Sequence, residues 1–187
     1  MDRERQRTRD ALLALRCQLG EERAFADLVQ EFERPLRYFL AKLIGDEERA
    51  LDVLQEVWLR ALRGLRKLSD PGALRPWLYR LAHGVAIDGL RRETARGRIE
   101  GNSLPEHDLA EPEPDLSGED AVQLHRKLGT LELKHREVLV LHFLENLSLA
   151  EVAQIVDCPV GTVKSRLHHA KRALADALRR TNHVGPK

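Results

Sequence analysis

Apolar residues recur along this chain at the spacing of helices, and no segment alternates as a strand does. Between residues 147 and 174 the pattern predicts two short helices. Ser148 followed by Glu151 is a capping box, which satisfies the first amide groups of one helix. Pro159 ends that helix because it has no amide proton to donate. The inner faces of the two helices would carry Leu149, Val152, Ala153 and Val156, then Val163, Leu167, Ala170 and Leu174.

The outward face of the second helix is polar and cationic, and residues 164–172 contain no acidic side chain. Two short helices at a sharp angle, the second carrying cations outward, are typical of a helix-turn-helix that enters the DNA major groove. A solvated amphipathic hairpin is the plainer alternative. A face selected only for solubility, however, usually mixes charges of both signs.

Two segments nearer the N-terminus show the same helical periodicity. Residues 21–43 predict a helix that Pro35 should bend or break in two, because proline removes a backbone hydrogen bond. Residues 46–65 predict a second helix, with Asp46 placed to cap it. Its expected buried stripe is Leu51, Leu54, Val57, Trp58, Ala61, Leu62 and Leu65.

A third helix is predicted from Asp70, with Pro71 in its first turn, to about residue 93. Arginines cluster at its end, which suits a phosphate backbone. Residues 1–20 are highly charged, and we expect from them only a frayed or weakly docked helix.

The net charge does not indicate a nucleic-acid-binding protein. The chain has 31 Lys and Arg residues and 30 Asp and Glu residues, for a net charge of +1. Any attraction to DNA must therefore come from local segregation of charge. Such segregation is present in residues 99–120, which hold several prolines and eight acidic residues without one Lys or Arg. This composition predicts a flexible, extended linker.

Composition also restricts the class of protein. Leu, Ala and Val dominate the apolar positions and only 4% of residues are aromatic, which favours helices over sheets. The N-terminus is too polar for a secretory signal and no apolar run reaches about 20 residues, so we expect a cytoplasmic protein. Cys17 and Cys158 lie far apart, so neither a disulfide nor a zinc site is predicted, and no metal or cofactor is required.

Three stretches resemble one known family, in that family's order and spacing. Cys158–Leu167 resembles region 4.2 of the extracytoplasmic-function (ECF) sigma factors of bacterial RNA polymerase, which belong to the sigma-70 family. Asp52–Trp58 resembles region 2.2, and Arg75–Arg92 resembles regions 2.3 and 2.4. Together these matches cover roughly residues 20–180.

The resemblance implies an all-α protein of two small helical domains. Sigma region 2 would occupy residues 21–96, and sigma region 4, with the helix-turn-helix, residues 119–181. A flexible acidic linker over 97–118 would join them, after a charged segment 1–20 and before a disordered tail 182–187. In the family the linker threads the polymerase channel that later holds template strand and RNA, which an acidic chain could mimic.

The resemblance also implies partners and contact residues, and a protein that is not an enzyme. Core RNA polymerase would bind Asp52, Gln55 and Glu56. The promoter −10 element, as melted strand, would contact Lys67, Ser69, Asp70, Arg80, His83, Asp88 and Arg91. The −35 element, as duplex, would contact Thr162, Lys164, Ser165, Arg166, His168, His169 and Arg172, with Arg166 as the candidate for a bidentate contact to guanine. An anti-sigma protein, membrane-bound or soluble, is a further expected partner.

The chain departs from the family pattern at His83-Gly84, where many relatives carry Arg-Asn. A titratable imidazole there replaces a fixed cation, which leaves the preferred bases of the −10 element open. Trp77 could stack on a base, although core packing is the simpler interpretation. Trp58 is expected in the core, because it lies on an apolar stripe.

Two other interpretations remain at this point. A stand-alone helix-turn-helix regulator would use only the C-terminal domain, and it leaves the matches at 52–58 and 75–92 unexplained. An all-helical enzyme could use Glu56, His83 and Asp88 as acid and base groups. However, His83 and Asp88 point to different faces of one helix, and no metal-binding spacing such as H-E-x-x-H occurs.

Overall fold

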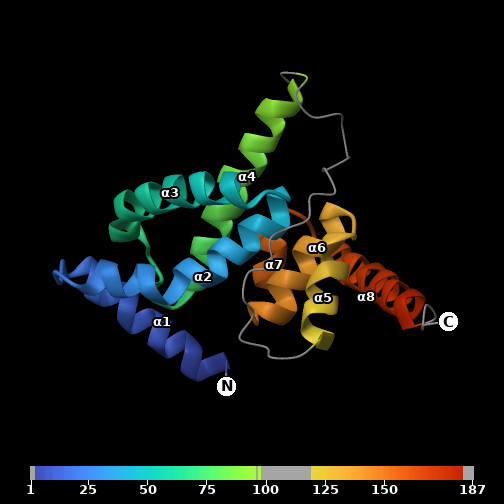
Figure 1. Cartoon of the computed structure of the whole chain (residues 1–187). Helices are drawn as coiled ribbons and strands as arrows, with labels where there is room; N and C mark the ends of the chain where they lie inside the picture. The colour runs from blue at the N-terminus through green and yellow to red at the C-terminus, as the bar shows by residue number, and fades with distance from the viewer. Residues whose placement is uncertain (1–2, 96, 98–118, 183–187) are drawn as a thin grey trace.

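The structure, a computed structural model, describes residues 3–95, 97 and 119–182. These residues form helices joined by turns, with no strand among them (Figure 1). The predicted acidic linker lies almost wholly outside the described residues, as does the end of the tail.

Two groups of helices make up the described part of the chain. The first consists of α1 (Arg3–Gln18), α2 (Ala24–Ile44), α3 (Glu47–Gly64), the 3₁₀ turns η1 (Leu65–Lys67) and η2 (Pro71–Ala73), and α4 (Leu74–Ala95). The second consists of α5 (Glu119–Gly129), α6 (Leu133–Leu139), the π-helical turn η3 (Val140–Leu144), α7 (Leu149–Ile155) and α8 (Val160–Asn182). The all-α architecture expected from the sequence is confirmed.

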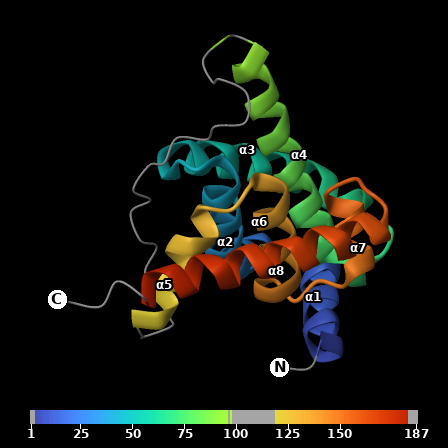
Figure 2. The same ribbon diagram turned by 90° about the vertical axis from the view of Figure 1, so that its right-hand side faces the viewer.

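The two helical groups pack directly on each other. Helix α4 lies against α7, and α2 lies against α6, as Figures 1 and 2 show from two directions. Buried apolar residues from both groups form one continuous cluster, which includes Phe32 and Tyr79 from the first group and Leu141 and Val152 from the second. The domains therefore share a core in this arrangement instead of standing apart.

The predicted helix starts are confirmed where a cap defines them. The Asp46 side chain accepts a hydrogen bond from the Arg49 amide at 3.0 Å and starts α3. Asp70 accepts from the Gly72 amide at 2.9 Å, with Pro71 in the first position of η2. At Ser148, both hydrogen bonds of the capping box are present. Each cap provides a hydrogen-bond acceptor for an amide group that would otherwise have no partner.

Two expectations about the first two helices need correction. Of the two outcomes expected at Pro35, a bend or a break, the break does not occur: α2 continues to Ile44, where Gly45, with φ of 79°, ends it. Helix α1 is not weakly docked, because Ala14 is fully buried and Gln18 donates to the carbonyl oxygens of Leu65 and Leu68.

The buried stripe of α3 is narrower than the spacing predicts. Leu54, Val57 and Ala61 are buried, as expected. Leu51 and Leu62 instead are 42% and 56% exposed, because the helices that cover α3 reach only its inner side. Trp58 is partly buried and packs against the core, with its ring 6.2 Å from that of Phe25 in an edge-on arrangement.

We predict that Ser148→Ala destabilises the protein by about 1 kcal/mol, because the capping box loses its hydroxyl acceptor. Urea unfolding of the full chain, followed by circular dichroism, measures this change. Gln154→Ala is the control, since Gln154 is exposed on the same helix and should leave the unfolding midpoint near that of the wild type. Equal midpoints for the two variants would contradict the assignment of Ser148 as the cap.

Candidate nucleic-acid interface

Helix α8 presents the cationic face that the sequence predicts. Asp157, with φ of 49°, turns the chain between α7 and α8, and the Pro159 carbonyl accepts from the Thr162 amide at 2.9 Å. Val163 and Ala170 are fully buried on the inner side. Facing outward and exposed are Lys164, Ser165, His168, His169 and Arg172, while Thr162 is half-buried.

Arg166 differs from its neighbours on α8. Its Nη1 donates to Oε1 of Glu137 on α6 at 2.9 Å, and its side chain is 26% exposed. Glu137 is itself buried. A contact between Arg166 and guanine therefore requires this ion pair to break, whereas the exposed side chains of α8 are available without rearrangement.

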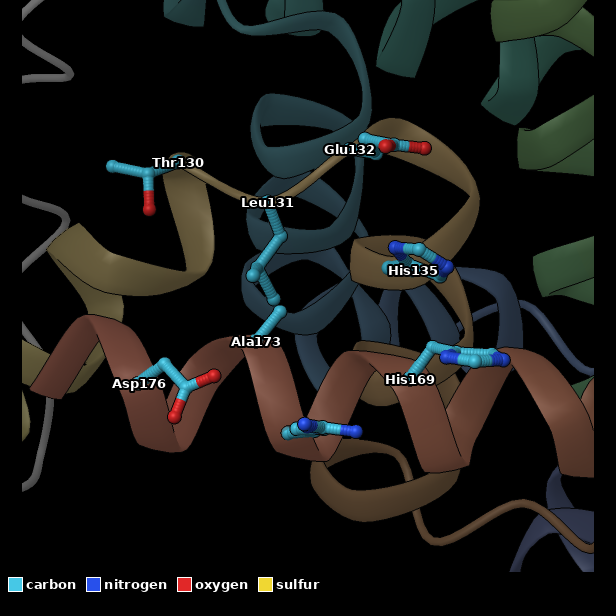
Figure 3. Close-up of a pocket in the computed structure, with 8 residues that line it drawn as sticks. Thr130, Leu131, Glu132, His135, His169, Ala173 and Asp176 are labelled. Carbon is cyan, nitrogen blue, oxygen red and sulfur yellow. The ribbon is translucent and has the colours of Figure 1, made fainter.

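Beside this face, α8 and the start of α6 border an open hollow of about 460 Å³ (Figure 3). His135 from α6 and His169 from α8 lie on the same side of it, with ring centroids 6.2 Å apart. Arg172 also lines the hollow, and Glu132 and Asp176 bring acidic groups to it. The mixture of both charge signs does not select one kind of ligand.

The predicted −10 residues lie on the segment before α4 and on α4 itself. Lys67, Ser69 and Asp70 are exposed there, and Asp70 also pairs with Arg7 of α1 at 3.2 Å. On α4, Arg80 and Asp88 are exposed, as is Arg91.

His83 is the exception among the α4 residues. Its side chain is only 14% exposed, and its Nε2 lies 3.2 Å from Oε2 of Glu137. The structure thus brings a predicted −10 residue and a predicted −35 residue, Arg166, to the two oxygens of one carboxylate. Nothing in the local sequence pattern indicates this contact.

Trp77 is partly buried, and its packing agrees with the simpler interpretation. It lies against the core, and a Cβ atom added to Gly64 would stand only 3.0 Å from its ring. This close approach to α3 favours core packing over base stacking for Trp77.

The predicted polymerase-binding residues share the outer face of α3. Asp52 and Gln55 are exposed, and Glu56 accepts from Nε of Arg60 at 2.7 Å. Leu51, Leu59 and Leu62 are exposed on the same face, at 42%, 51% and 56%. The sequence did offer a signal for this patch, because Leu59 falls outside the predicted buried stripe.

A buried polar network joins the two helical groups, and no sequence pattern indicated it. The Tyr79 hydroxyl donates to Glu145, and Nη1 of Arg75 lies 3.7 Å from the same carboxylate. Arg75 also pairs with Asp10 of α1, with its Nε 2.9 Å from Oδ2 of Asp10. Burial raises the pKa of the Glu145 carboxyl, and burial together with the Glu145 charge raises that of Tyr79 well above its usual value.

A second buried polar cluster lies between α2, α5 and α6. Nζ of Lys42 donates to the His125 carbonyl oxygen at 3.3 Å, and the Tyr38 hydroxyl bonds Nδ1 of His125. Arg136 is also buried, and its Nη1 donates to the Gly129 carbonyl oxygen at 2.8 Å. Burial, aided by the Arg136 charge, lowers the pKa of Lys42 to about 8.

Within the described part of the chain, no group of three or more His, Cys, Asp or Glu side chains is arranged to hold a metal ion. Nor does any helix there combine the length and apolar character that a membrane span requires. Cys17 and Cys158 are both free and partly buried.

Comparison with known proteins agrees with this geometry. Residues 28–96 match the family described as Sigma-70 region 2, and residues 121–174 match Sigma-70, region 4. Several relatives align over almost the whole chain and are named ECF RNA polymerase sigma factors. The chain belongs to the ECF sigma factors.

The sigma factor is 34% identical to the ECF RNA polymerase sigma factor SigC of Mycobacterium tuberculosis, over 88% of this chain and 89% of the relative. It is 30% identical to SigW of Bacillus subtilis, over 86% of this chain and 91% of the relative. Among solved structures, CnrH in complex with the cytosolic domain of CnrY has the same fold, with a TM-score of 0.63 at 24% identity over 91% of this chain and 97% of CnrH.

Membership of this family decides between the interpretations left open by the sequence. Sigma factors are transcription initiation factors and not enzymes, so the acid and base set of Glu56, His83 and Asp88 is set aside. The match to region 2 also disfavours a stand-alone regulator that uses only its C-terminal domain.

We predict that neither of the chain's two tyrosines ionises while the protein is folded. Burial raises the pKa of both Tyr38 and Tyr79, so the native state keeps the neutral phenols. Their contribution to stability is complete below about pH 10 and is lost as the pH rises above that value, where only the unfolded chain ionises. Absorbance at the tyrosinate band during an alkaline titration should therefore rise together with loss of helical circular dichroism. A rise that precedes unfolding would contradict the burial of that tyrosine.

Proposed function

We propose that this sigma factor binds core RNA polymerase through α3 and directs initiation by reading two promoter elements. Helix α8 reads the −35 element as duplex, and the segment 67–70 with α4 reads the −10 element as melted strand. The observation that carries this proposal is the exposed face of α8 over residues 164–172, which has no acidic side chain, in a chain that also contains region 2. The sigma factor acts in the cytoplasm, where its polymerase is.

The −35 proposal is supported by the shape and charge of α8. Lys164, His168 and Arg172 are exposed on a helix that follows a tight turn, which is the arrangement that a major groove admits. Ser165 lies between them as a small hydrogen-bonding group. Lys164 and Arg172 suit phosphates, because an extended cation can reach the backbone on either side of the groove.

The −10 proposal is supported by the polar residues before and along α4. Lys67 and Ser69 are exposed at the segment that would hold a base extruded from the strand. Unstacking a base costs a few kcal/mol, so a preformed pocket is needed to offset it. Arg80 and Arg91 are exposed along α4, where they can follow the strand backbone.

The polymerase-binding proposal is supported by the mixed face of α3. Gln55 lies between Leu51 and Leu62, which are apolar and exposed on the outer face of the helix. Exposed apolar residues ringed by polar ones are typical of a surface that binds another protein. Asp52 and Glu56 supply charge at its edge.

An anti-sigma protein is the proposed regulator. CnrH is seen in complex with the cytosolic domain of CnrY, and RpoE of Bartonella quintana with the anti-sigma factor NepR. Both share the fold of this chain at TM-scores of 0.63. By analogy, a protein of that kind would bind this sigma factor and withhold it from the polymerase.

We expect Gln55→Ala combined with Glu56→Ala to weaken binding to core RNA polymerase by about tenfold, as truncation of an interface hot spot does. Fluorescence anisotropy of labelled sigma factor, titrated with purified core enzyme, measures this affinity. The matched control is Gln30→Ala with Glu33→Ala, which removes the same side chains from exposed positions of α2. Equal affinities for the two double variants would show that α3 is not the docking face.

We expect Lys164→Ala to weaken promoter binding by the holoenzyme to a similar degree at all promoters, because the lost contact is to phosphate. The slope of log affinity against log salt should fall by about one. Filter binding on promoters mapped by sequencing runoff transcripts provides both quantities. Arg37→Ala removes an equal charge from exposed α2 and serves as the control. An unchanged slope for Lys164→Ala would exclude it from the interface.

A further inference from the structure

Helix α1 packs against the segment that the proposed function assigns to the −10 strand. Between α3 and α4 the chain passes through η1, residues 68–70 and η2, and α1 contacts both of these turns. Lys67 and Ser69, which would contact an extruded base, are exposed within this stretch. Their side chains can keep one geometry only if the backbone that carries them keeps one as well.

One side chain of α1 binds this backbone on both sides of Lys67. Nε2 of Gln18 donates to the carbonyl oxygen of Leu65 at 3.1 Å and to that of Leu68 at 2.8 Å. The amide nitrogen of glutamine carries two protons, and here each has an acceptor. Leu65 is the first residue of η1 and Leu68 is its C-cap, so the two hydrogen bonds span the whole turn.

The backbone changes direction at Leu68. Its φ of −67° and ψ of 110° are extended, whereas the turn before it is 3₁₀-helical. A turn this short has few hydrogen bonds of its own, and here the Leu68 amide donates to the Leu65 carbonyl at 3.1 Å. Ser69 and Asp70 are exposed and gain little from apolar packing. The bond from Gln18 to the Leu68 carbonyl therefore helps to fix the direction in which the chain leaves the turn.

A second contact from the same face of α1 lies further along the segment. Arg7 and Gln18 are about three helical turns apart and so share one face, with the fully buried Ala14 between them. Arg7 pairs with Asp70 at 3.2 Å, but the two side chains are 62% and 58% exposed. Such an exposed ion pair contributes little. The half-buried Gln18 is therefore the stronger support of residues 65–70.

Asp70 also serves the fold of the segment. Its Oδ1 accepts from the Gly72 amide at 2.9 Å, and its Oδ2 accepts from Nη2 of Arg7 at 3.2 Å. Both oxygens of this carboxylate are thus engaged. Lys67 and Ser69 are then the residues of the segment whose side chains present hydrogen-bonding groups to a base.

We propose that Gln18 is a positioning residue for the −10 element, which keeps residues 65–70 in the shape that accepts an extruded base. The proposal rests on the proposed function, because it takes this segment as the one that holds the base. Unstacking a base is costly, and ordering a mobile segment at the same moment would add a cost in conformational entropy. Gln18 removes that second cost before DNA binds, without touching DNA itself.

The test replaces Gln18 in the full chain and measures capture of a single strand by the holoenzyme. Gln18→Met keeps the length of the side chain and removes both donors. Gln18→Asn keeps the amide but is one methylene shorter, so it cannot reach both carbonyl oxygens as Gln18 does. The probe is a fluorescent single strand that carries the −10 sequence mapped from runoff transcripts, and anisotropy reports its affinity. Strands with one abasic site at each position in turn, bound to wild type, identify the captured base.

We expect Gln18→Met to weaken binding of the intact strand by about tenfold, as for a segment whose competent shape is about one-tenth populated. Gln18→Asn should weaken it in the same direction by a smaller factor. On the strand that lacks the captured base, both variants should bind as wild type does, because the segment then has no base to hold. A general loss of structure would instead weaken binding of the two strands equally.

Two control variants separate the local effect from changes in composition and stability. Gln30→Met makes the same replacement at an exposed position of α2. Ser148→Ala removes a helix cap of the second helical group and leaves the segment untouched. Both should bind the intact strand as wild type does. The Gln18 variants should also keep the wild-type affinity for core polymerase, which depends on α3 in the proposed function.

The outcomes distinguish this inference from the proposed function. If wild type captures a base and Gln18→Met binds the intact strand equally well, the positioning role is wrong and the proposed function stands. An equal loss on the intact and abasic strands also overturns the positioning role. If no abasic site weakens binding of the wild-type holoenzyme, the proposed reading of the −10 element fails and this inference fails with it.

Discussion

Two buried carboxylates, those of Glu137 and Glu145, impose the constraint on which the arrangement of this protein depends. A carboxylate removed from water must find hydrogen-bond donors, and here the donors come from helices far away in the sequence. Tyr79 and Arg75 meet Glu145, and His83 meets Glu137. As a result, the position of the second domain is set by polar side chains of α4 as well as by apolar packing.

In this arrangement the proposed binding faces differ in how exposed they are. The outer faces of α3 and α8 carry the exposed residues that we assign to polymerase and duplex, and both remain accessible when the domains are packed. Part of the α4 face, by contrast, turns inward at His83. In this arrangement the face that we assign to core polymerase is exposed, whereas the face that we assign to melted DNA is partly covered at His83.

Local features of the structure could be predicted from sequence because their causes are local. The caps at Asp46, Asp70 and Ser148 each join a side chain to an amide two or three residues away, and the inner face of α8 follows from periodicity alone. The contacts between domains could not be predicted in this way. Nothing in the spacing near His83 indicates Glu137, and the exposed leucines of α3 obey the same periodicity as buried ones.

The predicted contact residues show the same division. Most of the −35 and −10 residues are exposed as a reading surface requires, but their roles come from the family resemblance and remain predictions. Arg166 illustrates the limit, since a cation on the correct face of α8 turned out to be engaged with Glu137. Sequence reasoning places a side chain on a helix face, whereas its partner depends on the tertiary packing.

Helix α1 has a practical consequence for how the molecule can be divided. The match to sigma region 2 begins at residue 28, yet Asp10, which holds Arg75, and Gln18, which satisfies two carbonyl oxygens before α4, both precede it. A fragment cut at that family boundary would remove Asp10, so the largely buried guanidinium of Arg75 would lose this ion pair. Any dissection of this chain into separate domains should therefore begin the first fragment ahead of α1.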